Sequence, residues 1–177
     1  MSQLPNERYQ RAHEHNFKHA YPQAYADGLY SGPKMPKIKT ANGLTTFICN
    51  FLLWHEHRAT RVNVMGRLVE GKEKHGNDIV TVKKYIPSTT RRGTSDISAT
   101  IRGRSVMIEI KIGADRPSPY QLAEQIKERR AGGYYEFVSS PEDFFKLYDS
   151  IMNEICTIHN TLLIEGTCVK CMDDKNN

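Results

Sequence analysis

Three charged residues that could carry out chemistry together lie in one short stretch, "TSDISATIRGRSVMIEIKIG", residues 94–113. Asp96 comes just before an alternating apolar segment, and Glu109 and Lys111 lie at the end of a second one. Alternation of this kind is typical of half-buried β-strands, and the glycine between the two segments indicates a tight turn. The stretch therefore predicts a β-hairpin that carries two carboxylates and one ammonium.

The pairing of the two strands decides whether these side chains share a face. Successive side chains of a strand point to opposite faces of the sheet. If the apolar side chains of both strands face the core, the numbers of paired residues add up to an odd number, unless a β-bulge intervenes. A two-residue turn at 102–103 pairs Asp96 with Glu109. A turn at 103–104 pairs Asp96 with Lys111 instead. Both turns gather the three charged side chains on the face opposite the apolar set.

Neighbouring carboxylates repel each other, so this arrangement indicates a cation between them. Hard oxygen ligands suit Mg²⁺ or Mn²⁺, which keep several waters for a substrate phosphate. Such a metal polarises a phosphate oxygen and acidifies a bound water. Lys111 would orient or deprotonate that water, or stabilise the charge that develops on the phosphate. This chemistry is phosphodiester hydrolysis; the alternative is a solvent-facing hairpin in which Glu109 and Lys111 form an ordinary ion pair.

The segments around the hairpin predict the elements that position it. A helix after "TANG" that runs to about His57 is indicated by apolar residues at helical spacing, namely Leu44, Phe47, Ile48, Phe51 and Leu52. "ATRVNVMG" and "IVTVKKYI" predict strands, with "GRLVEGKEKHGND" as a polar excursion between them. Ser118-Pro119 and Ser140-Pro141 begin two more helices, with the strand "YYEFV" between them. This order predicts an α/β fold with a central mixed β-sheet flanked by helices.

Length and composition indicate one soluble domain with extensions. The 177 residues include 38% apolar and 25% charged residues, and neither a long apolar run nor a secretory leader is visible. We therefore expect a cytoplasmic protein, in the host cell if it is phage-encoded, without a membrane partner. The expected divisions are a basic N-terminal arm at 1–39, the main domain at 40–150, and a C-terminal helix extension and tail at 151–177.

The cysteines and the net charge give weaker indications. The four cysteines are too few and too unevenly spaced for a disulfide framework, so thiols are expected. Two pairs, Cys156-x-x-His159 and Cys168-x-x-Cys171, resemble half-sites for zinc, but the turn signals of a zinc ribbon are missing. The net charge of +5 is compatible with a polyanionic partner.

With these residues the chain resembles the PD-(D/E)xK nuclease superfamily, and within it the virus-type replication-repair nucleases and the archaeal Holliday-junction resolvases. The resemblance rests on "GTSDIS", "IEIK", "SPYQ" and "AGGYYEFVSSPEDFFKLYD", and it spans roughly residues 41–148. It implies a restriction-endonuclease-like core. It also implies that Asp96, Glu109 and the main-chain carbonyl of Ile110 bind the metal, and that Lys111 is the catalytic lysine.

Two further positions of the family pattern are less clear in this chain. Gln121 matches the family's helix glutamine, which is expected to support the site, although Ser118-x-x-Gln121 is also a capping box. The family usually places a Glu on the first helix as a further ligand. Here the corresponding region offers three other residues, Thr45, Thr46 and Asn50, and Glu56 lies too near the helix end to replace that ligand. Reduced activity, a partner-supplied ligand or a single-metal site are the alternatives.

The basic residues near the hairpin suggest a nucleic-acid partner. Arg61, Arg67, Arg91 and Arg92 are the candidates for phosphate contacts, which would make binding fall steeply with salt. A role in solubility alone is the competing interpretation. The predicted partner is DNA, with branched DNA as one option. A homodimer is suggested only by analogy with the resolvases, because a junction presents paired strands to a two-fold enzyme.

The predicted function is that of a metal-dependent DNA endonuclease in phage or mobile-element replication, recombination or repair. An alternative is a catalytically inactive nuclease-like module that binds nucleic acid or a protein partner, because the helix Glu is missing. A third is a structural component of a mobile element without nucleic-acid contact.

Overall fold

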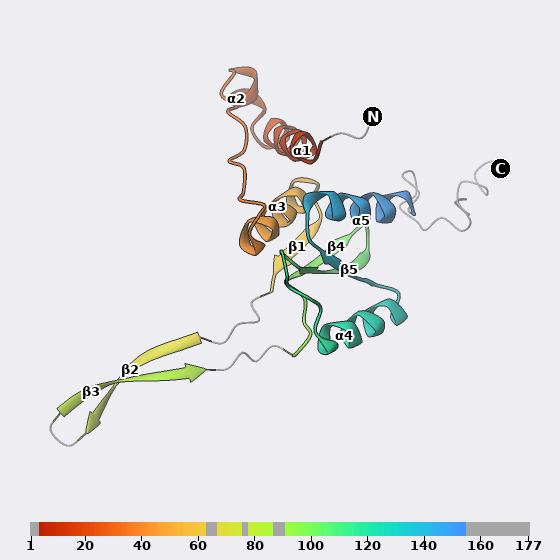
Figure 1. Ribbon diagram of the computed structural model, residues 1–177. Helices are drawn as coiled ribbons and strands as arrows, with labels where there is room; N and C mark the ends of the chain where they lie inside the picture. The colour runs from red at the N-terminus through yellow and green to blue at the C-terminus, as the bar shows by residue number, and fades with distance from the viewer. Residues whose placement is uncertain (1–3, 63–66, 76–77, 87–90, 155–177) are drawn as a thin grey trace.

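The computed structural model describes residues 4–62, 67–75, 78–86 and 91–154 (Figure 1). The helices are α1 (Pro5–Ala20), α2 (Pro22–Ala26), α3 (Ala41–Trp54), α4 (Pro119–Arg130) and α5 (Pro141–Asn153). The strands are β1 (Arg58–Arg61), β2 (Arg67–His75), β3 (Asp78–Ile86), β4 (Ile97–Ile101), β5 (Arg104–Ile110) and β6 (Tyr134–Val138). None of the helices in this described part has the length and apolar character needed to cross a membrane. Both candidate half-sites for zinc lie outside the described residues.

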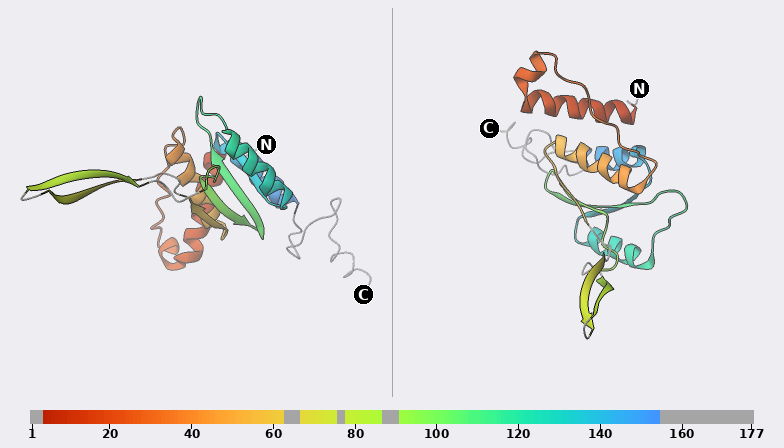
Figure 2. Two further views of the ribbon diagram at one scale, coloured as in Figure 1. Left: turned by 90° about the horizontal axis from the view of Figure 1, so that it is seen from below. Right: turned by 90° about the vertical axis from the view of Figure 1, so that its left-hand side faces the viewer.

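The main sheet has four strands in the order β1-β4-β5-β6. β4 is antiparallel to β1 and β5, whereas β6 runs parallel to β5, so the sheet is mixed. Helices α3 and α5 cover one face of this sheet, and α4 lies on the other (Figures 1 and 2). The prediction of a mixed α/β fold with a central sheet flanked by helices is therefore confirmed.

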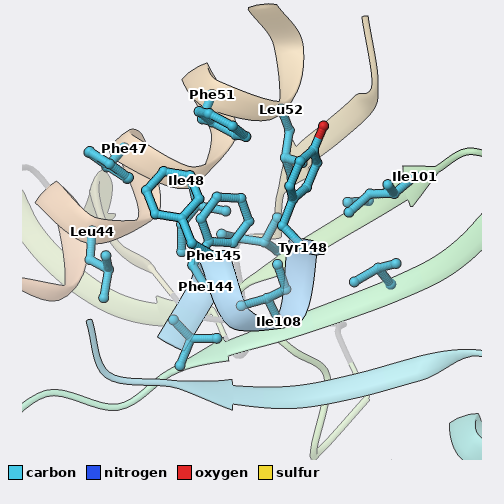
Figure 3. Packing of buried hydrophobic residues seen from close by; sticks show 14 of the residues in the cluster. Leu44, Phe47, Ile48, Phe51, Leu52, Ile101, Ile108, Phe144, Phe145 and Tyr148 are labelled. Carbon is cyan, nitrogen blue, oxygen red and sulfur yellow. The ribbon is translucent and has the colours of Figure 1, made fainter. Parts of the chain in front are cut away.

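The core lies between the sheet and the helices α3 and α5 (Figure 3). All five apolar residues that predicted α3 are buried in it. The helix is capped by Thr40, whose side chain accepts a hydrogen bond from the N–H of Gly43. It ends at Trp54 rather than near His57, because Glu56 adopts a left-handed conformation with φ of 59°. The N–H of His57 then closes the helix end on the carbonyl of Leu52.

The predicted hairpin is formed by β4 and β5. Ile97 lies opposite Ile108, so the numbers of paired residues add up to an odd number, as the burial of both apolar sets requires. The turn is the one at 102–103, where φ is 49° at Arg102 and 82° at Gly103. Two consecutive positive φ angles are typical of the type I′ turn that suits a twisted two-residue hairpin. Of the two registers considered, the structure adopts the one that sets Asp96 opposite Glu109.

The N-terminal segment is more ordered than the sequence predicted. Helix α1 packs on α3 and α5, and Tyr9 is fully buried with its ring stacked 4.3 Å from that of Phe47. Arg8 forms a bidentate ion pair with the carboxylate of Asp149 of α5, with N–O distances of 2.7 and 2.8 Å. Residues 5–20 thus form a helix that packs against α3 and α5. The sequence did not predict this helix because its buried face consists of only Tyr9 and Ala12.

Strands β2 and β3 form a separate two-stranded antiparallel ribbon in which Gly71 lies opposite Val82. The ribbon projects from the body of the molecule in all three views (Figures 1 and 2). The prediction of a strand at "IVTVKKYI" is confirmed by β3. The prediction of a polar excursion before it was wrong, because most of that segment is β2. Among the described elements none covers the ribbon, which is consistent with the many polar residues of β2, where a buried strand would be apolar.

Candidate active site

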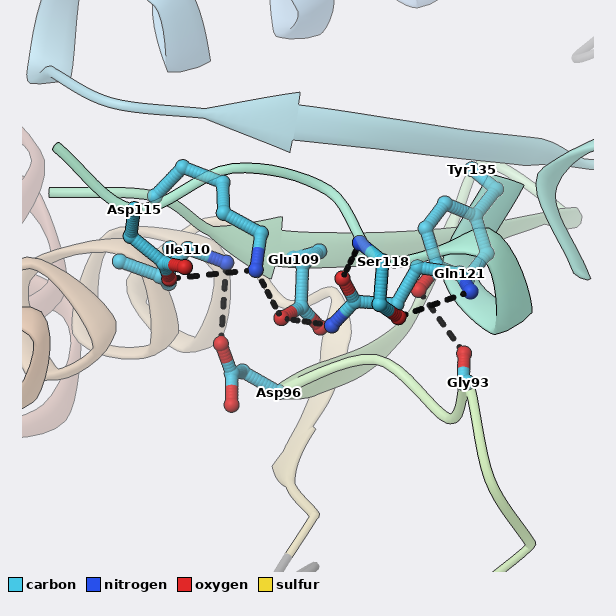
Figure 4. Close-up of polar contacts among 9 residues, drawn as sticks. Gly93, Asp96, Glu109, Ile110, Asp115, Ser118, Gln121 and Tyr135 are labelled. Atoms are coloured by element: carbon cyan, nitrogen blue, oxygen red, sulfur yellow. Dashed lines mark hydrogen bonds and ion pairs between the residues drawn. The ribbon is translucent and has the colours of Figure 1, made fainter.

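The hairpin brings the three predicted residues together at the end of the sheet opposite its turn (Figure 4). Asp96 directly precedes β4, Glu109 is the last but one residue of β5, and Lys111 follows that strand. One carboxylate oxygen of Asp96, Oδ2, accepts a hydrogen bond from the N–H of Ile110 at 2.9 Å. The Nζ of Lys111 lies 3.1 Å from Oε1 of Glu109. The main chain of β5 therefore holds the Asp96 carboxylate, and Lys111 holds the Glu109 carboxylate.

Gln121 in the first turn of α4 performs both roles that the sequence left open. Its Oε1 accepts a hydrogen bond from the N–H of Ser118 at 2.9 Å, and the Ser118 hydroxyl accepts one from the N–H of Gln121 at 3.3 Å. This is the predicted capping box. Its Nε2 donates to Oε1 of Glu109 at 2.5 Å. The helix cap thus orients the side-chain amide toward the Glu109 carboxylate.

Glu109 is the buried member of the carboxylate pair, with only 7% of its side chain exposed. Burial raises the pKa of its carboxyl, and the charge of Asp96 raises it further, while the ammonium of Lys111 opposes both effects. The net effect is a raised pKa. Two negative charges are therefore costly here without additional positive charge, which is the electrostatic property of a cation site.

Lys111 is paired with a second carboxylate that the sequence did not indicate. Its Nζ lies 3.1 Å from Oδ2 of Asp115 as well as 3.1 Å from Glu109. Burial alone lowers the pKa of Lys111, but its hydrogen bonds and ion pairs with the two carboxylates outweigh that effect and raise it. Lys111 is therefore an ammonium at neutral pH. A spacing of four residues carries no meaning outside a helix, so nothing in the sequence marked Asp115.

Tyr135 of β6 is another residue near the pair that the sequence did not single out. Its hydroxyl donates to the carbonyl of Gly93 at 2.9 Å, in the loop that leads to Asp96 (Figure 4). Burial raises the pKa of this phenol strongly, and the charges of Glu109 and Asp96 add to the shift. Gln125 of α4 donates to the Tyr135 carbonyl at 2.7 Å. Tyr135 therefore connects the sheet, α4 and the loop that carries the first carboxylate.

The residues considered in place of a first-helix Glu do not reach the pair. Thr45 and Thr46 donate to carbonyls one turn earlier in their own helix, both at 2.8 Å. Asn50 donates to the hydroxyl of Tyr9, at 3.1 Å. Glu56 lines a hollow beside the hairpin turn, at the far end of the sheet. The structure thus offers no side chain from α3 to the carboxylates.

The donor set fits a hydrated divalent cation better than a fully protein-bound one. Within the described ranges, no group of three or more His, Cys, Asp and Glu side chains is arranged to hold a metal ion. Within the same ranges, Oδ1 of Asp96 and Oε2 of Glu109 make no hydrogen bond, so one oxygen of each carboxylate is available to a cation. Mg²⁺ commonly binds through one or two carboxylates and keeps its waters, which is what these two oxygens would allow.

Three of the four predicted phosphate-binding arginines contact neighbouring side chains. Arg61 donates to Oδ1 of Asn42 on α3 at 2.5 Å. Arg91 forms an ion pair with Glu124 of α4. Arg92 donates to the Tyr120 hydroxyl at 3.2 Å. Their phosphate contacts stay predictions, as does that of the fourth arginine, Arg67, which begins strand β2 of the ribbon.

The chain was compared with protein-family models, curated proteins and solved structures, and none of the three comparisons gave a match. The resemblance to the nuclease superfamily therefore rests on the motif residues themselves.

Proposed function

We propose that the protein is a metal-dependent DNA endonuclease with a restriction-endonuclease-like core that acts in phage or mobile-element replication, recombination or repair. The observation that supports this best is the convergence of Asp96, Glu109 and Lys111 at one end of the β4–β5 hairpin, with Glu109 buried against Asp96. A solvent-facing hairpin with ordinary surface charges would not bury a carboxylate beside another one.

In this proposal Asp96, Glu109 and the main-chain carbonyl of Ile110 hold Mg²⁺ or Mn²⁺. When bound, the metal polarises the phosphate and supplies an activated water. Lys111 carries its positive charge at neutral pH because of its two ion pairs, so it stabilises charge that develops on the phosphate rather than serving as a base. Gln121 is a positioning residue, since it holds Oε1 of Glu109 from the helix cap.

A cleavage panel tests the proposal. Linear duplex, nicked, flapped and four-way-junction DNAs are incubated with Mg²⁺, with Mn²⁺ and with EDTA. We expect cleavage that requires the metal, and a loss on the order of 10²- to 10⁴-fold in Asp96→Asn, Glu109→Gln and Lys111→Met. Glu142→Gln, an exposed carboxylate of α5, is the matched control and should keep full activity. Cleavage that persists in all three site variants would refute the assignment.

The second candidate is a catalytically inactive module that binds nucleic acid, or a protein partner. It is favoured by one observation, that α3 offers no third carboxylate and no larger metal-binding group occurs in the described ranges. This candidate predicts salt-sensitive DNA binding without cleavage and with no tightening by Mg²⁺. Titration of DNA affinity with Mg²⁺ separates the two, because a metal that screens the carboxylate pair should tighten binding in the wild-type chain but not in Asp96→Asn.

A further inference from the structure

The β2–β3 ribbon leaves the body of the molecule beside the candidate active site. Val62, the first residue after β1, donates its N–H to the main-chain carbonyl of Asp96 at 2.8 Å. The chain that leads into the ribbon is therefore hydrogen-bonded to the residue that carries the first carboxylate. Figure 1 shows the ribbon departing between β1 and α4.

The returning chain is also fastened at this edge, by contacts of residues 91–94 with α4. The Cζ of Arg92 lies 5.3 Å from the centre of the Tyr120 ring, in addition to the hydrogen bond between the two side chains. Gly93 has φ of 87°, and a Cβ on it would lie 2.5 Å from the carbonyl oxygen of Tyr120. Only glycine fits there. Asp96 follows three residues later, so the described chain from Arg91 to the first carboxylate is fastened to α4.

The ribbon itself has no partner in the described part of the chain. In the described sheets its strands pair only with each other. Isolated two-stranded ribbons have marginal stability in water, so a ribbon of this kind is expected to act on something outside the domain. Each strand has nine residues, which corresponds to roughly 30 Å at 3.3 Å per residue. One turn of duplex DNA is about as long, 34–36 Å, and its major groove admits a two-stranded β-ribbon.

The charges of the ribbon favour a polyanion. Its two strands contain five basic residues, Arg67, Lys72, Lys74, Lys83 and Lys84, against three acidic ones, Glu70, Glu73 and Asp78. Lys72, Lys83 and Lys84 are exposed, and Lys83 pairs with Glu70 at 3.0 Å on the surface. By the register, Lys72 and Lys83 lie on one face of the ribbon and Lys84 on the other. Positive charge therefore lies on both faces of the ribbon. This arrangement suits a DNA groove, which has a phosphate backbone on either side.

We propose that the β2–β3 ribbon is a DNA-binding element that contacts about one turn of duplex next to the carboxylate pair. This inference rests on the proposed nuclease function, since it assigns the substrate-binding surface of the same site. It adds that the substrate has a continuous duplex arm on the ribbon side, and that affinity depends on the length of this arm.

The test measures DNA affinity without metal, so that cleavage plays no part. Fluorescence anisotropy gives the Kd of fluorescent duplexes of 10, 20 and 30 base pairs at several salt concentrations. We expect Lys72→Gln/Lys83→Gln/Lys84→Gln to weaken binding of the long duplexes at least tenfold. The slope of log K against log salt should fall by about 2–3, since each lost phosphate contact removes about 0.9. The gain in affinity with duplex length should also be lost in this variant.

The matched control is Lys18→Gln/Lys34→Gln/Lys146→Gln, which removes the same charge from exposed positions outside the ribbon. It should keep the affinity, the salt slope and the length dependence of the wild-type chain. Thermal melts should show that both triple variants are folded, because none of these lysines is buried.

Two results would overturn the ribbon proposal. One is a wild-type affinity and salt slope in the ribbon variant, and the other is self-association that the ribbon variant abolishes, measured by light scattering, which would assign the ribbon to a second copy of the chain. The binding assay contains no metal, so neither result tests the proposed nuclease activity. The cleavage panel tests that activity, and a chain that cleaves no DNA with any metal contradicts it. The role of the ribbon is decided by the binding data alone.

Discussion

The molecule contains two antiparallel hairpins that differ in what surrounds them. The β4–β5 hairpin lies inside a four-stranded sheet, with its apolar face against α3 and α5 and with Asp96, Glu109 and Lys111 at the end opposite its turn. The β2–β3 ribbon has longer strands and no covering layer. Burial fixes the register and the face of every side chain in the first hairpin. The strands of the second hairpin pair with each other through the main chain, so we expect its role to come from what it contacts outside the domain.

The largest expected difference between the two hairpins concerns the stability lost when one valine of each hairpin is shortened to alanine. Val106 of β5 is fully buried, whereas Val82 of β3 is only partly buried. Val106→Ala should lower the free energy of unfolding by about 2–3 kcal/mol, because it removes methyl groups and leaves a cavity. Val82→Ala should cost less than about 0.5 kcal/mol, as for surface substitutions. Urea unfolding monitored by circular dichroism measures both, and equal losses would contradict the contrast between the hairpins.

A smaller change in stability is expected when one glycine of each hairpin is replaced by alanine. Gly103 has φ of 82° in the turn of the buried hairpin. Gly103→Ala should cost about 1–2 kcal/mol, since an L side chain is strained in that conformation. Gly71 in β2 has no positive φ, and a Cβ there would meet only the Val82 carbonyl oxygen, at an ordinary 4.0 Å. Gly71→Ala should be neutral or stabilise the ribbon slightly, because alanine reduces the freedom of the unfolded chain. Thermal melts of the two variants give the comparison, and destabilisation by Gly71→Ala would show that this position is constrained.

The same contrast explains which features the sequence predicted. Parity limited the register of β4–β5 to two possibilities because one face had to be buried, and both placed Asp96 on the face of Glu109 and Lys111. The turn at 102–103 selects the register that pairs Asp96 with Glu109. The helix caps at Ser118 and Ser140 followed from local hydrogen-bonding chemistry. The strand β2 was missed because an uncovered ribbon imposes no alternation on its residues.

The tertiary contacts of the site were less accessible to sequence reasoning. Asp115 reaches Lys111 through the course of a loop, and Tyr135 reaches Gly93 across two neighbouring elements. Neither contact has a fixed spacing. Helix α1 was missed for a similar reason, because one aromatic residue, Tyr9, supplies most of its packing. Such contacts depend on how elements meet, and one sequence alone does not contain that information.

The stability of the body of the molecule should also depend on pH through one partly buried histidine, His57. Burial lowers the pKa of His57 to about 4, and the charges of His55 and Arg102 contribute, against the opposing charge of Glu56. Between about pH 6.5 and pH 4 the imidazole of His57 is therefore protonated in the unfolded chain but neutral in the folded one. The free energy of unfolding falls as the pH drops through this range. The loss due to this one ring should be about 1–2 kcal/mol after allowance for its partial exposure.

His57→Gln should remove that part of the acid sensitivity, measured as the difference in Tm from the wild-type chain between pH 7.5 and 4.5. Tyr148→Phe is the informative control. The Tyr148 hydroxyl lies 3.2 Å from Nε2 of His57, but burial is the larger cause of the pKa shift. The phenylalanine variant should therefore keep the wild-type pH dependence. A His57→Gln chain that is as acid-sensitive as the wild type would assign the effect to other groups.

A small effect on stability, but one that connects the two hairpins, is expected at Tyr120. This side chain is 54% exposed, and it receives both the hydrogen bond and the cation–π contact of Arg92. Tyr120→Leu should cost less than about 1 kcal/mol of stability, as expected for an exposed contact of this kind. If residues 91–94 fix the direction in which the ribbon leaves the site, the variant should nevertheless weaken binding to a 30-base-pair duplex more than to a 10-base-pair duplex. Leu122→Ala, an exposed neighbour on α4 without such contacts, serves as the control. The direction of the ribbon matters only for DNA that is long enough to reach both the ribbon and the carboxylate pair. An equal loss of affinity for both duplex lengths would therefore show that Tyr120 and Arg92 do not fix this direction.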